Sequence, residues 1–322
     1  MQRSQRTLRK KSLVIVEISN QYHFPPYSAK RFKNMKQNIN SNKTAFRLCL
    51  SAVTIFLFLA PCFAQTQKLI KRTTYKTETV ELGAGGTVSI TGAPNGSITV
   101  EGWQKNEVEI SAEVEMQAAT EADLTELAKV SGFAIDADMV HVSVTSVGTY
   151  DKEYMKRVAK KFPKNLLGLP FTINYTIKVP VYCDLNIDGG KGDLTLSKVE
   201  GALRINYLET NAKLNLIGGS VVATFAAGTI NIVIPNRSWR GRSADVQLVT
   251  GAMNVQLPLN LNANLDAEVL RNGKIENSLT NLKPLNRTKF TDKLIAAKAG
   301  SGGAPLSFTV GDGTLTLKET EK

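Results

Sequence analysis

Apolar and polar residues alternate with a period of two over much of the chain beyond residue 80. Alternation of this kind predicts β-strands that bury one face. The residues between the alternating segments are rich in glycine, proline and asparagine, which favour tight turns. We therefore predict short strands over residues 87–90, 97–100 and 108–115, a further strand over 139–147, and a pair of long strands around 171–179 and 182–187.

One segment has a helical period instead. Thr120 and Asp123 have the spacing of a helix N-terminal capping box, and Leu124, Leu127 and Ala128 follow at the spacing of one helix face. We predict one short amphipathic helix near residues 120–131.

The region after Asp188 contains an internal repeat. Its turn residues are separated by 9, 10, 8 and 9 positions, and four of the five precede two apolar residues of the same parity. Each unit therefore predicts a short strand and a turn at a residue that tolerates positive φ. The turn residues are Gly192, Gly201, Asn211, Gly219 and Gly228, and the apolar pairs are Leu194/Leu196, Leu203/Ile205, Leu214/Leu216 and Ile230/Ile232.

Two such units give a period of about 18 to 19 residues, which is the length of one rung in a β-solenoid. An antiparallel β-sandwich is the alternative, because its strands also recur every 8 to 12 residues. The shared parity of outward polar residues such as Thr195 and Arg204, with few hairpin signals, favours the solenoid. We predict an all-β fold, a single-stranded β-helix or solenoid that a loop over residues 281–305 interrupts.

An uncharged, mostly apolar stretch over residues 48–60 follows a segment rich in lysine and arginine. This is the pattern of a secretory signal peptide, and it is shorter than the roughly 18 to 20 apolar residues of a membrane span. We predict cleavage after Ala64. The mature protein is then exported, to the periplasm or to the cell surface, and has no transmembrane span.

A signal peptide that starts at Met35 has an ordinary length, whereas one that starts at residue 1 is unusually long. We interpret residues 1–34 as an extension that is discarded or not translated, and residues 35–64 as the cleaved signal peptide. Residues 65–80 are a linker or a first edge strand. The β-repeat domain then comprises residues 81–322.

Composition and charge narrow the classes of function. Hydrophobic residues make up 42% of the 322 positions and charged residues 21%, as in globular proteins. The net charge of +12 is concentrated in residues 1–64, which hold 11 of the 40 lysines and arginines and one of the 28 acidic residues. The rest of the chain is nearly neutral, so we expect no nucleic-acid partner.

Few residues are available for catalysis or metal binding. After cleavage the chain keeps one histidine, His141, and one cysteine, Cys183, so neither a disulfide nor a Cys/His zinc site can form within it. His141 lies on the strand face opposite to its valine neighbours, and we expect it to face solvent. We expect Cys183 to be a small core residue.

The acidic residues around the repeat are also poor candidates. The run Gly189–Leu194 differs from a calcium-binding nonapeptide in the position of its aspartate, Asp193. Asp184 and Asp188 can share a face, but Asp193 has the opposite parity. We therefore expect that the protein is not an enzyme and that it has neither a metal site nor a cofactor.

Two basic patches are candidates for contact with a polyanion or glycan. In the first, a basic helical insertion near residues 151–164, Tyr154, Val158 and Phe162 have the spacing of one helix face that either lies on an anionic surface or caps the solenoid. The second patch, residues 237–242, has two possible forms. It either presents an aromatic plane and guanidinium groups to a ligand, or it is a solvated loop whose tryptophan folds back on the core. The candidate contacts are Lys156, Arg157, Lys160 and Lys161 in the first patch and Arg237, Trp239, Arg240 and Arg242 in the second.

Several runs of residues resemble the bacterial putative-adhesin family of exported β-strand-repeat proteins, also called toast-rack domains. They are Asp-Leu-Asn-Ile-Asp-Gly-Gly-Lys-Gly-Asp-Leu-Thr-Leu from Asp184, Gly-Ala-Leu-Arg-Ile, Gly-Thr-Ile-Asn-Ile, and Ile-Lys-Val-Pro over residues 177–180. The resemblance covers roughly residues 82–317, and it implies a single-stranded β-helix in the cell envelope or beyond, without established catalytic residues. The helix near 120–131 and the basic insertion depart from the family pattern.

Together these observations predict a non-enzymatic exported protein of the cell envelope or surface with an adhesion or scaffold role. Its partner is then an envelope polymer or a membrane protein. Two alternatives stay open: a β-helix protein that binds or cleaves polysaccharide, and an envelope-stress interaction module.

Overall fold

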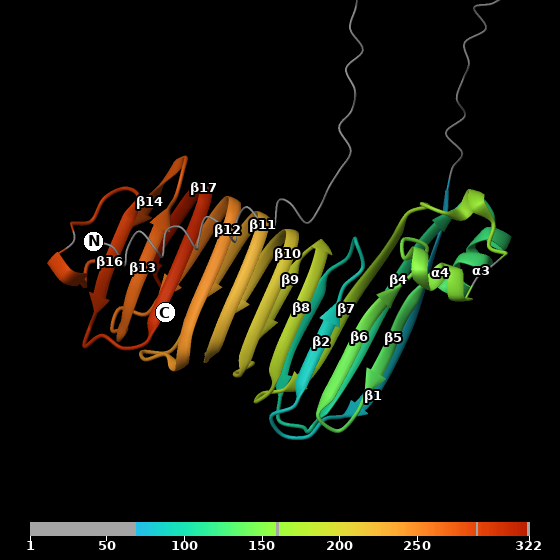
Figure 1. Ribbon diagram of the computed structural model, residues 1–322, viewed down its shortest axis with the longest axis horizontal. Coiled ribbons are helices and arrows are strands. Elements are labelled where there is room, and N and C mark those ends of the chain that lie inside the picture. Colours follow the sequence, from blue (N-terminus) through green and yellow to red (C-terminus); the bar gives the residue numbers. More distant parts are fainter. Residues whose placement is uncertain (1–68, 159–160, 288, 321–322) are drawn as a thin grey trace, which may run out of the picture. The chain divides into compact units, whose positions relative to one another are not determined.

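The computed structural model describes residues 69–158, 161–287 and 289–320. Within them, 17 strands form one continuous hydrogen-bonded sheet, accompanied by two α-helices and two 3-10 helices (Figure 1). The predicted all-β fold class is therefore confirmed.

The central strands stack in parallel. β10 pairs with β8 and β9 on one side and with β11 on the other, at an offset of 18 residues. β11 pairs in parallel with β12 at an offset of 23 residues. Successive rungs of a β-solenoid give parallel pairs of this kind, whereas a sandwich meander pairs its strands antiparallel. These strands are β8 (Asp184–Lys191), β9 (Leu194–Ser197), β10 (Ala202–Asn215), β11 (Gly218–Val233) and β12 (Arg240–Leu257).

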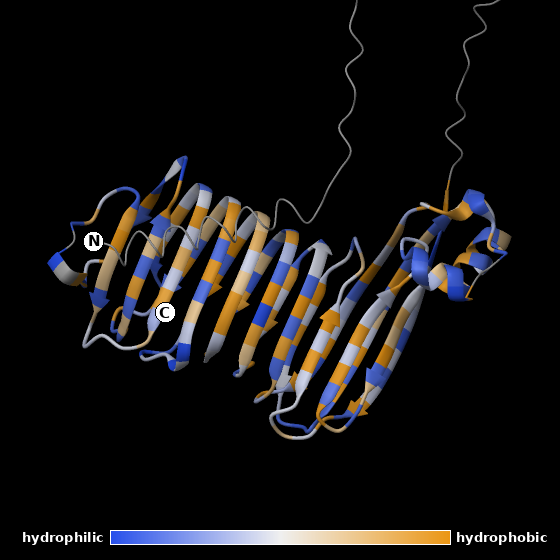
Figure 2. Ribbon diagram, viewed as in Figure 1, coloured by the Kyte–Doolittle hydropathy of each residue, from blue (hydrophilic) through white to orange (hydrophobic). Residues whose placement is uncertain are grey.

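Each rung folds back on itself. An extended chain of 18 residues would span roughly 60 Å, but the rung returns to within one strand spacing, about 4.8 Å, of its start. The reversal is visible in β10, where Tyr207 and Ala212 are both buried although their positions differ in parity. Each rung thus has two half-strands whose inward side chains share one core. Figure 2 shows the alternation of apolar and polar residues along these strands.

The core consists of columns of apolar side chains, one residue from each rung. Stacking equivalent positions removes the side chains from water on both sides, which is the main stabilising contribution in such a fold. One fully buried column contains Leu194, Ala212, Ile230, Met253 and Leu315.

Glycines form one corner of the rungs. Gly228 and Gly251 have φ angles of +132° and +140°. A Cβ atom on Gly228 would lie 1.9 Å from the carbonyl oxygen of Thr210, and one on Gly251 would lie 2.0 Å from that of Gly228. A side chain at Gly228 or Gly251 would therefore force neighbouring rungs apart.

Strands that come earlier in the chain extend the stack beyond β8 and β9. β2 (Thr87–Thr91) and β3 (Ile98–Trp103) pair in parallel with β8 and β9. On their other side they pair in parallel with β6 (His141–Val147) and β7 (Phe171–Pro180). The order of rungs in the stack is therefore not the order in the sequence.

Antiparallel strands complete this end of the sheet. β4 (Glu107–Ala118) pairs with β7 and with β1 (Ile70–Glu81), and β5 (Gly132–Ala137) pairs with β6. The sequence predicted that residues 65–80 are either a linker or a first edge strand. The structure places residues 70–80 in the strand β1, whose partner is β4.

The predicted amphipathic helix is α3 (Glu121–Val130). Its N-cap is Thr120, whose hydroxyl oxygen accepts a hydrogen bond from the backbone N–H of Asp123 at 3.1 Å. Leu124 and Leu127 are buried as expected, whereas the third buried residue is Val130 and not Ala128.

At the opposite end, β17 lies between β12 on one side and β13 and β14 on the other, and it pairs in parallel with all three. The loop predicted over residues 281–305 was wrong, because this segment contains β15 and β16. β16 pairs antiparallel with β13 through a strand rich in alanine, a residue that gives a weak strand signal. These elements are β13 (Ala263–Val269), β14 (Gly273–Asn277), β15 (Leu282–Pro284), η2 (Leu285–Arg287), β16 (Leu294–Ala299) and β17 (Pro305–Glu319).

The predicted extension and signal peptide, residues 1–34 and 35–64, lie outside the described residues. None of the helices in the described part of the chain has the length and the apolar character needed to cross a membrane.

Candidate binding groove and basic patches

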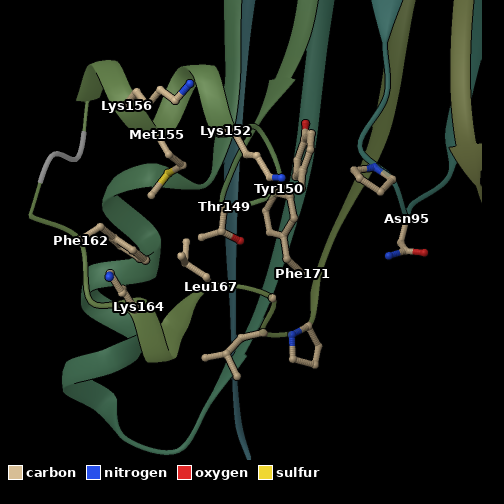
Figure 3. Close-up of a pocket in the computed structure, with 14 residues that line it drawn as sticks. Asn95, Thr149, Tyr150, Lys152, Met155, Lys156, Phe162, Lys164, Leu167 and Phe171 are labelled. Atoms are coloured by element: carbon tan, nitrogen blue, oxygen red, sulfur yellow. The ribbon is translucent and has the colours of Figure 1, made fainter. Parts of the chain in front are cut away.

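The basic insertion between β6 and β7 forms a groove. It contains the helix α4 (Lys152–Val158) and the 3-10 turn η1 (Lys164–Leu166). The groove has a volume of about 910 Å³ (Figure 3). This volume lies within the roughly 300–1,000 Å³ that is typical of small-molecule sites.

Asp151 fixes the start of α4. Its carboxylate oxygen Oδ1 accepts hydrogen bonds from the backbone N–H groups of Glu153, at 3.0 Å, and Tyr154, at 2.9 Å. Such bonds satisfy N–H groups that have no partner within the helix. The helix direction, and with it the placement of its lysines, therefore depends on Asp151.

The helix packs on a different face from the one predicted. Met155 is its buried residue, whereas Val158 is 55% exposed. The expected face of Tyr154, Val158 and Phe162 does not form, because α4 ends at Val158, before Phe162. Figure 3 shows Met155, Phe162 and Leu167 pointing toward a common space.

Tyr150 and Phe171 anchor the base of the groove. Their rings stack with centroids 6.0 Å apart, and the Tyr150 hydroxyl donates a hydrogen bond to the carbonyl oxygen of Ser146 at 2.6 Å. Burial raises the pKa of Tyr150 to about 12, so this hydroxyl keeps its proton at neutral pH. Leu166, at the end of η1, is buried in the main core and holds the other side of the insertion.

Three lysines stand at the rim of an apolar lining. Lys152 and Lys156 come from α4, and Lys164 comes from η1. Lys156 forms an ion pair with Glu153 at 2.6 Å, whereas Lys152 and Lys164 have no such carboxylate partner in the described part of the chain. The described lining contains no acidic side chain. Its apolar side chains include Met155, Phe162, Leu167, Leu169 and Phe171.

Of the four contacts predicted in this insertion, one lines the groove. Lys156 does so, Arg157 and Lys161 are exposed outside the lining, and Lys160 is not among the described residues. Lys152 and Lys164 also line the groove, but neither was predicted from the sequence as a contact.

A signal for the groove was nevertheless present in the sequence. Leu166, Leu167 and Leu169 are interrupted by Gly168 and followed by a proline, and both of these residues disfavour a regular strand or helix. Apolar residues in such a segment have to pack irregularly, here beside a run of lysines.

The second predicted patch does not present an aromatic plane. Trp239 is 7% exposed, and its indole N–H donates a hydrogen bond at 3.0 Å to a backbone carbonyl of the preceding rung. Arg240 forms an ion pair with Glu200 at 3.2 Å. Of the two interpretations of this patch, the structure shows the one in which the tryptophan folds back on the core. Arg237 and Arg242 are exposed.

Polar side chains on the outer face of the stack form hydrogen bonds between neighbouring rungs. The amide nitrogen of Asn254 donates to the amide oxygen of Asn231 at 3.0 Å. These two residues belong to one set of aligned outward positions, which we call the outer column. The outer column consists of Thr195, Lys213, Asn231, Asn254 and Thr316.

The remaining candidates for chemistry have structural partners. His141 is exposed and lies 3.1 Å from the hydroxyl of Ser89. Burial raises the pKa of the Cys183 thiol to about 12, which disfavours the reactive thiolate. Asp188 and Asp193 accept hydrogen bonds from asparagines of the next rung, at 2.8 and 3.4 Å. Among the described residues, no cluster of three His, Cys, Asp or Glu could hold a metal ion.

No family model matches the chain, and no curated protein does. Solved structures do match. For a putative cell adhesion protein from Clostridium sporogenes, the TM-score is 0.44 at 11% identity, over 77% of this chain and 100% of that one. A putative adhesin from Bacteroides fragilis matches with a TM-score of 0.30 at 11% identity, over 77% and 97% of the two chains.

A third structure, a putative lipid binding protein from Parabacteroides distasonis, matches with a TM-score of 0.27 at 10% identity, over 77% and 97% of the two chains. The adhesin descriptions of the first two agree with the resemblance seen in the sequence.

Proposed function

We propose that the chain is a non-enzymatic exported protein of the cell envelope or surface with an adhesion or scaffold role. The observation that carries this proposal is the outer column, in which polar side chains from successive rungs stand next to one another. Parallel stacking repeats these groups at the strand spacing of about 4.8 Å. A regular row of amide, hydroxyl and ammonium groups suits contact with a polymer that repeats hydroxyl groups, such as an envelope polysaccharide.

The outer column is also held in place by the stack. Its members lie on strands whose inward neighbours, such as Leu214, Ile230 and Val255, are buried. The Asn231–Asn254 hydrogen bond fixes two of the outward side chains relative to each other. Little conformational entropy is then lost when a polymer binds along the column.

Export is supported by the predicted signal peptide over residues 35–64. N-terminal sequencing of the protein recovered outside the cytoplasm should read from Gln65. A cytoplasmic protein that keeps the stretch over residues 48–60 would contradict this part of the proposal.

Binding of the full chain to immobilised envelope polysaccharides tests the adhesion role. The double variant Lys213→Ala/Thr316→Val changes the outer column but leaves the Asn231–Asn254 bond intact, and it should bind at least tenfold more weakly. The control Arg204→Ala/Val222→Ala changes exposed positions on the other half-strands, where Arg204 and Val222 pair, and it should bind normally.

Two results would overturn the proposal. Equal binding by both double variants would show that the outer column is not the contact surface. Release of sugar products from a polysaccharide by the purified full chain would show that the protein is an enzyme.

A further inference from the structure

The groove beside α4 has two chemically different parts. Its interior is hydrocarbon, and Leu167 in it leaves 48% of its surface exposed. Its rim carries Lys152, Lys156 and Lys164. An apolar pocket with a few charged groups at one margin is the usual form of a site for an amphipathic small molecule.

We propose that this groove binds an anionic amphiphile with a single acyl chain. The acyl chain lies against Met155, Phe162 and Leu167, and the carboxylate or phosphate head group lies between Lys152 and Lys164. This function is separate from adhesion through the outer column, which lies on other strands.

The charges favour this head group. Lys152 and Lys164 belong to different elements, α4 and η1, and neither has a carboxylate partner among the described residues. Two ammonium groups that line one groove give it a positive potential, which attracts an anionic head group. Lys156 contributes less, because Glu153 already neutralises it.

The walls of the groove are preformed. The stacked rings of Tyr150 and Phe171 fix one side, and the burial of Leu166 in the main core fixes the other. Asp151 fixes the direction of α4. A ligand therefore does not have to order these elements when it binds.

Two other occupants fit the groove less well. A bilayer surface would require a broad apolar helix face turned outward. α4 has only seven residues, about 10 Å; its Met155 points into the groove, and Val158 is its one largely exposed aliphatic side chain. An acidic peptide would need partners for its backbone amide groups, and most of the lining is side-chain hydrocarbon.

Displacement of a dansyl-labelled undecanoic acid from the full chain tests the proposal. Laurate and lauroyl lysophosphatidic acid are the anionic competitors, and their relative affinities distinguish a carboxylate from a phosphate head group. Dodecanol, which has no charge, should compete at least tenfold more weakly. From decanoate to myristate, each added methylene should raise affinity roughly threefold to fourfold.

Variants separate the roles of charge and apolar surface. Lys152→Gln/Lys164→Gln should weaken laurate binding at least tenfold and leave dodecanol binding unchanged. Leu167→Asp should abolish binding of both. The matched controls are Lys283→Gln/Lys298→Gln, two exposed lysines elsewhere, and Leu259→Asp, a leucine that is 51% exposed. All variants share the same N-terminus, so any contribution of the residues before Leu69 is common to them.

Several outcomes would overturn the proposal. Unchanged laurate binding by Lys152→Gln/Lys164→Gln, with native circular dichroism, would exclude the lysine-bound head group. Binding to phosphatidylglycerol vesicles without binding of laurate would show a membrane contact instead. Displacement of the probe by an acidic peptide, but not by laurate, would show a peptide site. Because the outer column is unchanged in these variants, failure here would leave the adhesion proposal standing.

Discussion

The stack from β8 to β12 and the insertion around α4 bury apolar residues in different ways. In the stack every inward side chain lies above an equivalent one, and residues such as Ile205 and Val246 are completely buried. In the insertion a short helix and a turn are held at their ends by Tyr150 and Leu166, and Leu167 stays half exposed. Regular repetition leaves little space between rungs, whereas irregular packing leaves a groove. We therefore expect stability to be concentrated in the stack and ligand binding in the insertion.

The glycine corner should show the largest effect on the stack. Gly251→Ala places a methyl group 2.0 Å from the carbonyl oxygen of Gly228 in the preceding rung, at a φ angle of +140°. We expect it to lower the free energy of unfolding by about 4 kcal/mol or more, measured by denaturant titration. Gly85→Ala is the matched control, because Gly85 has a φ angle of +74° but no atom within 4 Å of the added methyl group.

Gly85→Ala should lower the free energy of unfolding by only about 1–2 kcal/mol, from backbone strain alone. Equal losses in the two variants would mean that strain, and not the close approach of the rungs, makes the corner sensitive.

Truncating one aromatic side chain in each region measures the contrast directly. Phe225 is completely buried in the stack, and Phe225→Ala should reduce the free energy of unfolding by about 3–5 kcal/mol. Phe162 is half-buried in the groove, and Phe162→Ala should reduce it by about 1 kcal/mol or less. Thermal unfolding of both variants gives the comparison. A larger loss for Phe162→Ala would contradict the assignment of stability to the stack.

Polar contacts should give a smaller version of the same contrast. Asn254→Ala removes the hydrogen bond to Asn231 between rungs, and it should reduce the free energy of unfolding by about 1 kcal/mol. Lys156→Ala removes an exposed ion pair on α4, and its effect should be within about 0.5 kcal/mol of zero. If the lysine variant were the less stable of the two, the surface of the insertion would contribute more than we propose.

Alkaline pH should affect the insertion locally. Burial raises the pKa of Tyr150 from 10.0 to about 12, so the phenol ionises more readily in the unfolded chain. The stability that Tyr150 contributes is therefore complete below pH 10 and is lost as the pH rises through about 12. Hydrogen exchange of residues 149–171 should increase over this window. Tyr150→Phe should remove part of that increase. If the pH dependence of exchange were identical in the unmodified protein and in the variant, Tyr150 would be excluded as its cause.

The stack was more predictable from the sequence than the groove. The repeated parity of pairs such as Leu203/Ile205 and Leu214/Leu216 follows from the burial of one face in each half-strand, so the alternation and the 18-residue offset were visible in advance. The cap at Thr120 was visible for the same reason, because it depends on contacts within one turn.

Features that depend on distant segments could not be predicted in this way. The spacing of turns carries no information about which rung β17 pairs with, and β5 has a weak alternation that was missed. In the insertion, the sequence pattern did not show that Met155 packs inward while Val158 stays exposed. Lys152 and Lys164 line the same groove only because β6 and β7 hold the two ends of the insertion.

The position of β17 has a consequence for how the protein is made. The ribosome synthesises β13 and β14 before β17, yet β17 lies between them and β12. The rungs therefore cannot assemble one after another as the chain emerges, and the edge of β12 stays unpaired until the last strand arrives. A chain that stops before Pro305 would lose the connection between two parts of its core. Nascent or secreted intermediates should consequently need protection from aggregation at that edge.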